Sequence, residues 1–130
     1  MSVYLYPAVF QPENGLYNVT FPDLPDCYTC GDDLTDAVRM AQDVLADVLS
    51  DHELSGEPFA PPSELSSVAV PAGCIASLVL ADTDAWRRAH ATQAVKKTLS
   101  IPQWLNAAAE KRGVNFSQTL QDALRAQLGL

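Results

Sequence analysis

The sequence has few cysteines, few basic residues and no long apolar run. Its 130 residues include only three cysteines, an odd number that indicates reduced thiols rather than the disulfide framework of a small secreted protein. No apolar segment approaches the roughly 20 residues of a membrane span, and the N-terminus lacks the charged-then-apolar layout of a signal peptide. We therefore expect a cytoplasmic protein without membrane contact.

The scarce basic residues are unevenly distributed. Residues 1–70 contain twelve acidic residues and one basic residue, Arg39, whereas residues 95–130 contain five basic and two acidic residues, in a chain whose net charge is −8. An acidic segment repels nucleic acid and attracts basic proteins, and a basic segment favours a polyanion. We predict two domains with different partners, residues 1–92 and residues 93–130.

The first domain begins with patterns typical of strands. Val3–Phe10 is rich in β-formers but contains Pro7, which predicts an edge strand or a bulge. The tripeptide Glu13-Asn14-Gly15 is a hairpin signal, and Tyr17–Phe21 alternates apolar and polar residues. Because Cys27–Cys30 is a further short strand candidate that runs into Gly31, the sequence predicts a three-stranded meander.

A helix is predicted from Leu34 to about Leu49, because apolar residues recur there at i, i+3 and i+4. We expect the acidic residues at its start to cap free N–H groups, and those on its outer side to remain free for a partner. A basic protein partner would be steered by this acidic surface. The candidate residues for that contact are Asp32, Asp33, Asp36, Asp43 and Asp47.

After this helix, the segment Gly56–Pro62 reads as an extended proline-rich connector. Val68–Val70 and Ile75–Leu80 are further strand candidates, of which the longer and uninterrupted second one is favoured. The residues Asp82-Thr83-Asp84 are suited to capping a short helix through Arg88. The first domain is thus predicted to be α+β, an antiparallel sheet with one long helix.

The last part of the chain predicts a strand followed by two helices. From Val95 to Ile101 apolar and polar residues alternate apart from Lys97, and Pro102 ends the strand. A helix from Gln103 to Arg112 stops at Gly113, and a second apolar stripe begins after Asn115, a suitable N-cap. This order is a ribbon-helix-helix arrangement.

A single short strand with two helices cannot bury its own apolar face, so we expect a second copy of the chain to complete an antiparallel ribbon. Such a ribbon fits the major groove of DNA and would present Lys96, Thr98 and Ser100 to the bases and phosphates. The helix start at Asn115 and Phe116 would offer backbone N–H groups to a phosphate. The alternative is a dimerising strand with a helical hairpin and no DNA contact, and the sequence leaves open whether dimers pair into tetramers.

The whole order resembles the HicB family of bacterial antitoxins. The resemblance rests on Tyr-Asn-Val-Thr-Phe-Pro-Asp-Leu-Pro at residues 17–25, on Cys-Tyr-Thr-Cys-Gly-Asp at residues 27–32 leading into Leu-Thr-Asp-Ala at residues 34–37, and on Pro-Pro-Ser at residues 61–63. It implies a partial RNase-H-like lobe that binds and blocks a small basic HicA-type toxin, a messenger-RNA-cleaving ribonuclease, and a ribbon-helix-helix arm that binds operator DNA and represses the operon. The implied protein is not an enzyme and needs no cofactor.

Two other functions remain open, a stand-alone ribbon-helix-helix regulator whose acidic lobe senses a ligand, and a metal-dependent nuclease. Metal binding needs converging ligands, and Cys27 and Cys30 point to opposite faces of a strand. For a nuclease, Asp23 and Asp26 would have to meet the acids of the long helix, and nothing in the sequence indicates that they do. We therefore expect no metal site and no catalytic residues.

Overall fold

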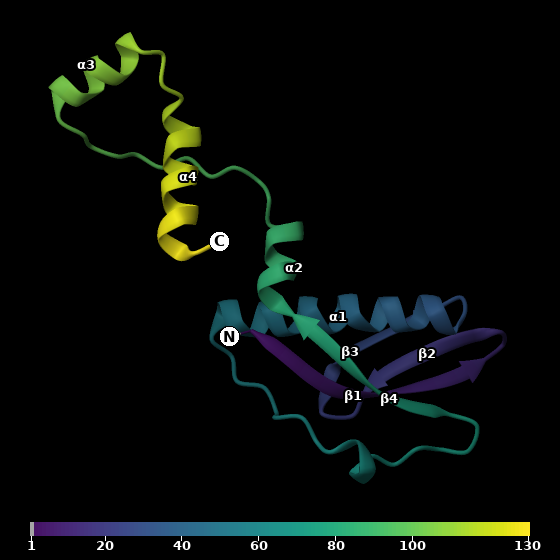
Figure 1. Cartoon of the computed structure of the whole chain (residues 1–130). Helices are drawn as coiled ribbons and strands as arrows, with labels where there is room; N and C mark the ends of the chain where they lie inside the picture. The colour runs from purple at the N-terminus through teal and green to yellow at the C-terminus, as the bar shows by residue number, and fades with distance from the viewer. Residues whose placement is uncertain (1) are drawn as a thin grey trace. The chain divides into compact units, whose positions relative to one another are not determined.

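The computed structural model describes residues 2–130, which cluster into two compact units that meet between Gln93 and Ala94 (Figure 1). The chain is α+β, as predicted, with a four-stranded antiparallel sheet and its long helix in the first unit. Over the described part of the chain, no helix is both long and apolar enough to cross a membrane.

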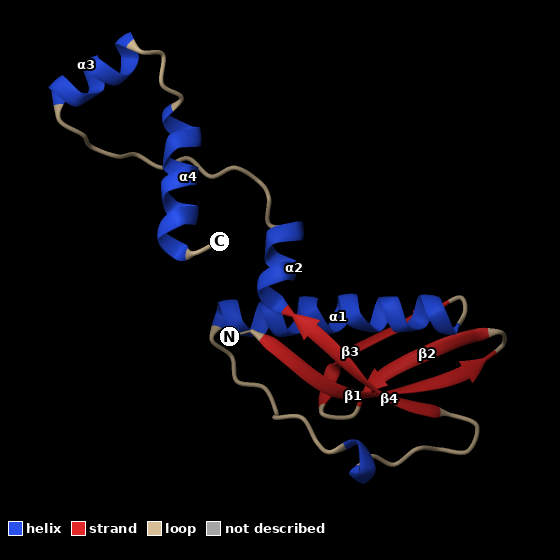
Figure 2. Ribbon diagram, viewed as in Figure 1, coloured by secondary structure: helices blue, strands red, loops and turns tan. Residues whose placement is uncertain are grey.

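The sheet of the first unit contains β1 (Val3–Glu13), β2 (Leu16–Phe21), β3 (Leu24–Gly31) and β4 (Ile75–Asp82), in the order β3-β2-β1-β4 (Figure 2). The predicted meander is therefore confirmed. Asn14 and Gly15 connect β1 to β2 with φ angles of 52° and 80°, the left-handed pair that a two-residue hairpin turn requires.

The predicted edge position of the first strand is wrong, because β1 lies between β2 and β4. The alternative of a bulge is wrong too, because the register of β1 with β4 is unbroken around Pro7. β4 pairs with β1 from Val3 to Phe10, whereas β2 pairs with it only from Val9 onward. Pro7 consequently lies where β1 has a neighbour on one side only, so its missing N–H removes no hydrogen bond from the β2 side.

The helix α1 (Leu34–Ser55) covers one face of the sheet (Figure 1). It is longer than the prediction, which ended near Leu49 where the apolar stripe stops. The extra turns are held by polar contacts instead, since His52 Nε2 lies 3.1 Å from Asp26 Oδ2 and Glu53 accepts hydrogen bonds from Tyr4 and Arg87. The core between helix and sheet includes Tyr6, Phe10, Val19, Phe21, Ala41, Leu45, Leu49 and Val79.

The connector from residue 56 to residue 74 contains only a single 3-10 turn, η1 (Leu65–Ser67), so the strand candidate Val68–Val70 is wrong. Three hydrogen bonds hold the connector to β1 and to the turn between β2 and β3. Asp23 accepts from the backbone N–H and the hydroxyl of Ser63 at 2.8 and 2.5 Å, and the Tyr6 hydroxyl donates to the carbonyl of Ala60 at 2.5 Å. Through Ser63, the Pro-Pro-Ser motif thus attaches the connector to the turn between β2 and β3.

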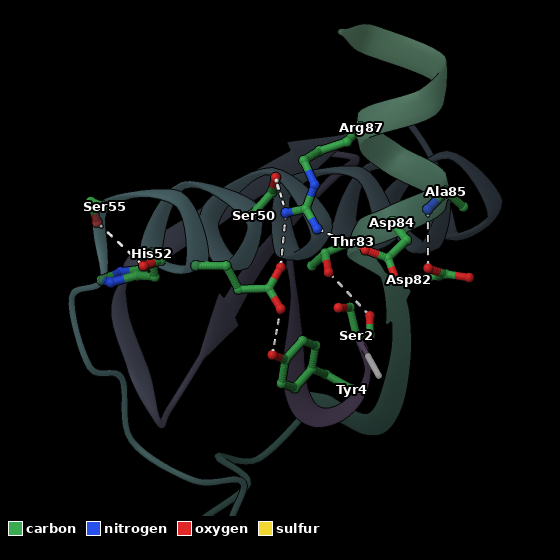
Figure 3. Close-up of polar contacts among 11 residues, drawn as sticks. Ser2, Tyr4, Ser50, His52, Ser55, Asp82, Thr83, Asp84, Ala85 and Arg87 are labelled. Carbon is green, nitrogen blue, oxygen red and sulfur yellow. Dashed lines mark hydrogen bonds and ion pairs between the residues drawn. The ribbon is translucent and has the colours of Figure 1, made fainter. Parts of the chain in front are cut away.

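The short helix α2 (Thr83–His90) follows β4 directly and is capped by Asp82, as predicted, because the Asp82 carboxylate accepts from the N–H of Ala85 at 3.0 Å. Arg87 in this helix donates to Glu53 and Ser50 of α1 at 3.0 and 3.2 Å (Figure 3). These contacts hold α2 against the end of α1.

The second unit contains α3 (Gln103–Lys111) and α4 (Phe116–Leu128). Both helices were predicted, and so was the break between them at Gly113, whose φ is 68°. The predicted strand at residues 95–101 is wrong for the single chain, where residues 91–102 form no helix or strand. The physical reason is that a strand needs a hydrogen-bonded neighbour, and residues 2–130 place none beside this segment.

Candidate functional site

At the acidic start of α1, the aspartate side chains accept hydrogen bonds from neighbouring backbone N–H groups. Asp33 is the N-cap and accepts from the N–H of Asp36 at 2.7 Å, while the Asp36 carboxylate accepts from the N–H of Asp32 at 3.0 Å. Asp36 also pairs with Arg39. The hydrogen bond from the Asp32 backbone, together with Arg39, lowers the pKa of Asp36 below its ordinary value. Asp33 and Asp36 are therefore engaged locally, as the predicted capping role requires.

Gly31 fixes the angle between β3 and this helix start. A Cβ at residue 31 would lie 2.3 Å from the backbone N of Ala37 and 2.5 Å from its Cα, distances that no side chain can occupy without moving the helix. Gly31 is buried and ends β3. The Gly-Asp pair that carries the family resemblance is thus a close backbone contact followed by a helix cap.

Asp43 and Asp47 have no such partners in the hydrogen bonds and ion pairs found within residues 2–130. Both are exposed, and the i, i+4 spacing from Asp43 through Asp47 to Asp51 places all three on one side of α1. The buried residues Ala41 and Leu45 lie on the opposite side, against the sheet. These carboxylates form a solvated negative surface whose field extends about 8–10 Å at physiological salt.

The sequence did not indicate the polar cluster that joins β1, α1 and α2 (Figure 3). Glu53 accepts from the Tyr4 hydroxyl at 2.7 Å and from Arg87 at 3.0 Å, and Arg87 also pairs with Asp84 at 2.7 Å. Burial raises the pKa of Glu53, but the hydrogen bonds outweigh burial and leave that pKa below its ordinary value. The hydrogen bond to Glu53, with burial, raises the pKa of Tyr4 to about 12. No spacing rule brings these residues together, because they lie on three separate elements.

Residues 95–101 form no strand, but from Lys97 to Ile101 alternate side chains of this segment still lie on opposite sides. Lys97, Leu99 and Ile101 line a groove of about 510 Å³ together with Asn106, Phe116 and Leu120. The candidate DNA contacts Lys96, Thr98 and Ser100 alternate with these residues along the chain and are exposed. The segment thus has one side toward the groove and one polar side.

The second unit has no core of its own. Within residues 94–130, all of which the structure describes, no residue is buried, and Trp104 and Leu128 are 71% and 68% exposed. Two short helices with their apolar stripes in water are not stable on their own, since most helix stability in proteins comes from packing of the apolar face. The apolar stripes of both helices are thus uncovered and available to a partner surface.

Asn115 caps α4 as predicted, because its side chain accepts from the N–H of Gln118 at 3.0 Å. This contact occupies one of the first free N–H groups of the helix, and others at the same end remain for an anion. Phe116 contributes its ring to the groove and is about half exposed.

The metal and nuclease alternatives find no support in the geometry. Over residues 2–130 there is no group of three or more histidine, cysteine, aspartate or glutamate side chains placed to hold a metal ion. Cys27 is buried and Cys30 is exposed, which confirms that the two thiols point to opposite faces. Asp23 is engaged with Ser63 and Asp26 with His52, rather than with the acids of the α1 outer side.

Comparison with known proteins identifies the family of this chain. Residues 4–72, more than half of the chain, match the family described as "HicB_like antitoxin of bacterial toxin-antitoxin system". The chain therefore belongs to the HicB-like antitoxins of bacterial toxin-antitoxin systems. No curated protein sequence matches it closely enough to count as a relative.

Three solved structures illustrate the similarity. A toxin-antitoxin complex from Streptococcus pneumoniae contains a chain 26% identical to this one, with a TM-score of 0.64 over 96% of this chain and 99% of that one. The antitoxin HicB of Burkholderia pseudomallei is 23% identical, with a TM-score of 0.57 over 97% of each chain. A chain of the HicA3 and HicB3 toxin-antitoxin complex is 21% identical, with a TM-score of 0.52 over 60% of this chain and 98% of that one. The second and third similarities are evidence for the fold alone.

Proposed function

We propose that this antitoxin has two binding activities, one in each unit. The first unit, a partial RNase-H-like lobe over residues 1–92, binds and blocks a small basic HicA-type toxin that cleaves messenger RNA. The second unit, residues 93–130, dimerises as a ribbon-helix-helix domain and binds operator DNA to repress its own operon. The chain acts by binding in the cytoplasm and is not an enzyme.

The observation that carries this division is the contrast between the two units. The first unit has a complete core and a strongly acidic surface, whereas the second is basic and has no buried residue among residues 94–130. An acidic folded lobe attracts a basic protein. The similarity to a chain of the Streptococcus pneumoniae toxin-antitoxin complex supports a toxin as that protein.

The second unit is proposed to gain its missing core from a second copy. Pairing of residues 95–101 with their counterpart would give each strand its hydrogen-bonded neighbour and cover the apolar side of the segment. The polar sides of both copies, each with Lys96, Thr98 and Ser100, would then face outward from the same ribbon. A ribbon of this width enters a major groove. The start of α4 at Asn115 and Phe116 would lie free for a phosphate.

The proposal is tested by binding of the full chain, and of residues 1–93, to duplex DNA from just upstream of its own gene at two salt concentrations. We expect specific binding by the full chain only, weakening as salt rises, because phosphate contacts release counterions. Lys96→Ala should reduce both affinity and salt dependence, whereas Arg39→Ala, which removes one positive charge from the acidic unit, should change neither. Equal DNA binding by the full chain and the fragment would contradict the assignment.

The toxin activity is tested by RNA cleavage with the purified small basic protein encoded by the neighbouring gene. Both the full chain and residues 1–93 should suppress cleavage, because the fragment retains the whole core of the lobe. Cleavage that continues at full rate in excess of either protein would refute the inhibitory role.

A further inference from the structure

The face of the sheet that points away from α1 carries an uncovered apolar surface. Antiparallel pairing places Leu5 opposite Leu80 and Pro7 opposite Leu78. Side chains alternate along a strand, and the alternate set of β1 and β4, with Tyr6, Ala8 and Val79, is buried against α1. We call the exposed side chains the outer patch: Val3, Leu5, Leu78 and Leu80, which are 47%, 46%, 43% and 55% exposed.

The connector covers only the neighbouring part of this face. Its first part contacts the α1-facing side chains Tyr4 and Tyr6 through Phe59 and Ala60. Beyond that it runs on the side of the sheet away from α1 (Figure 1), and η1 contacts β4. Pro7 and Val9, on the same face, are buried. Leu78, directly opposite Pro7, is exposed, and so are Leu5 and Leu80 one step further along the two strands. The fold thus closes one part of the face and leaves the other part open.

The outer patch also borders a free sheet edge. Within residues 2–130, β4 pairs with β1 and with no other strand, so its outward N–H and C=O groups have no ladder partner. A long edge strand with apolar neighbours is a template for another chain unless something covers it. Single exposed aliphatic residues are ordinary on proteins, but four adjacent ones beside an open edge indicate an interface.

The charge of the lobe decides what kind of partner fits. Residues 1–70 carry twelve acidic residues against one basic residue. Asp82, which is exposed, lies opposite Val3 of the outer patch, and the exposed Glu64 directly precedes η1, which contacts β4. A second copy of this lobe would bring two strongly negative surfaces together. A basic protein would be attracted by the same surface.

We propose that the outer patch, with the free edge of β4, is the surface on which the small basic toxin docks. This inference rests on the proposed function and names its contact surface. The carboxylates of Asp43 and Asp47 are separated from the outer patch by the thickness of helix and sheet, about 10 Å between layers. They act on the approach of the toxin through their field, whereas Leu5 and Leu80 hold it once docked.

The test separates these two roles kinetically with the full chain and the purified toxin. The double variant Leu5→Ser with Leu80→Ser should raise the dissociation rate about a hundredfold, roughly tenfold for each half-exposed leucine that docking would finish burying, with little change in association. The double variant Asp43→Asn with Asp47→Asn should slow association several-fold at low salt and leave dissociation unchanged.

Leu16→Ser is the matched control. Leu16 is 45% exposed and lies on the same sheet face, but eight residues along β1 from Leu5, which is roughly 26 Å at 3.3 Å per residue. Its dissociation rate should equal that of the parent chain. A common thermal unfolding midpoint among the variants verifies that all of them fold.

Three outcomes would overturn either this inference or the proposed function on which it rests. If the parent chain binds the toxin and the leucine double variant dissociates equally slowly, the docking surface lies elsewhere while the proposed function stands. If the leucine variant changes only the oligomeric state in light scattering, the patch holds a second copy. If the parent chain does not bind the toxin at all, the proposed function fails.

Hydrogen exchange on the parent chain gives a readout that needs no variant. Toxin binding should slow exchange of those amides between Ile75 and Asp82 that do not donate to β1. Unchanged exchange at all of these amides in a toxin-saturated sample would overturn the inference.

Discussion

Replacing Gly31 with alanine isolates one steric contact on which the lobe depends. The added Cβ would lie 2.3 Å from the backbone N of Ala37 and 2.9 Å from its Cβ. Backbone atoms cannot rotate away as the end of a flexible side chain can, so the first turn of α1 must move by about an ångström from β3. That movement disturbs the packing of the buried residues Ala41 and Leu45 on the sheet.

The expected cost lies at the upper end of overpacking penalties, about 3 kcal/mol or more. For a unit of this size that corresponds to a fall in Tm of about 12–24 °C. The assay is chemical and thermal unfolding followed by the fluorescence of Trp86, which packs against the core. Parent and variant both carry Trp104→Phe, so that the second unit contributes no signal.

Gly15→Ala is the informative control. Gly15 has φ +80° and open space around its Cβ position, so its replacement costs only backbone strain, about 1 kcal/mol. The steric reasoning requires Gly31→Ala to be clearly the more damaging of the two. A Gly31→Ala protein within 1 kcal/mol of the parent, or one no less stable than Gly15→Ala, would refute it.

Three further predictions address the other features of the molecule. Glu53→Gln should cost about 1–3 kcal/mol at pH 7. Because the pKa of Glu53 is lowered in the folded state, that contribution is present above its ordinary pKa and is lost as pH falls through the folded value. The difference in unfolding free energy between parent and variant should therefore shrink as pH falls below the ordinary pKa of a glutamate, and a difference that stays constant would contradict the assignment. Thr98→Ala should weaken binding to operator DNA by about 1–3 kcal/mol if the side chain reads a base, and equal affinities in a titration would remove it from the interface. Burial raises the pKa of the Cys27 thiol to about 12, so a thiol reagent should modify Cys30 at once and Cys27 only on unfolding, which mass spectrometry of the peptides would detect.

The elements that local chemistry determines were predictable from the sequence. The hairpin at Asn14 and Gly15, the caps at Asp33 and Asn115, and the break at Gly113 all depend on residues within four positions of one another. The antiparallel meander followed from the alternation of short strands. The acidic surface of α1 followed from the spacing of its aspartates.

What escaped prediction depends on contacts between distant parts of the chain. Pro7 indicated an edge strand, but the pairing of β1 with β4 across about 70 residues made β1 central. The last turns of α1 are held by the partners of His52 and Glu53, which lie on other elements. Residues 95–101 alternate like a strand but form none in the single chain, because a strand needs a hydrogen-bonded neighbour. The outer patch follows from strand register, which no periodicity within one segment reveals.

The pairing of the first strand with the last one of the sheet also determines when the lobe can fold during synthesis. Val3 pairs with Asp82, so β1 has no lasting partner along its first half until the ribosome has made β4. At about 5–20 residues per second, the 69 residues from Glu13 to Asp82 take roughly 3–14 seconds to translate. A nascent chain therefore exposes the first half of its apolar N-terminal strand throughout that interval, and each new molecule completes its lobe only after a delay set by translation.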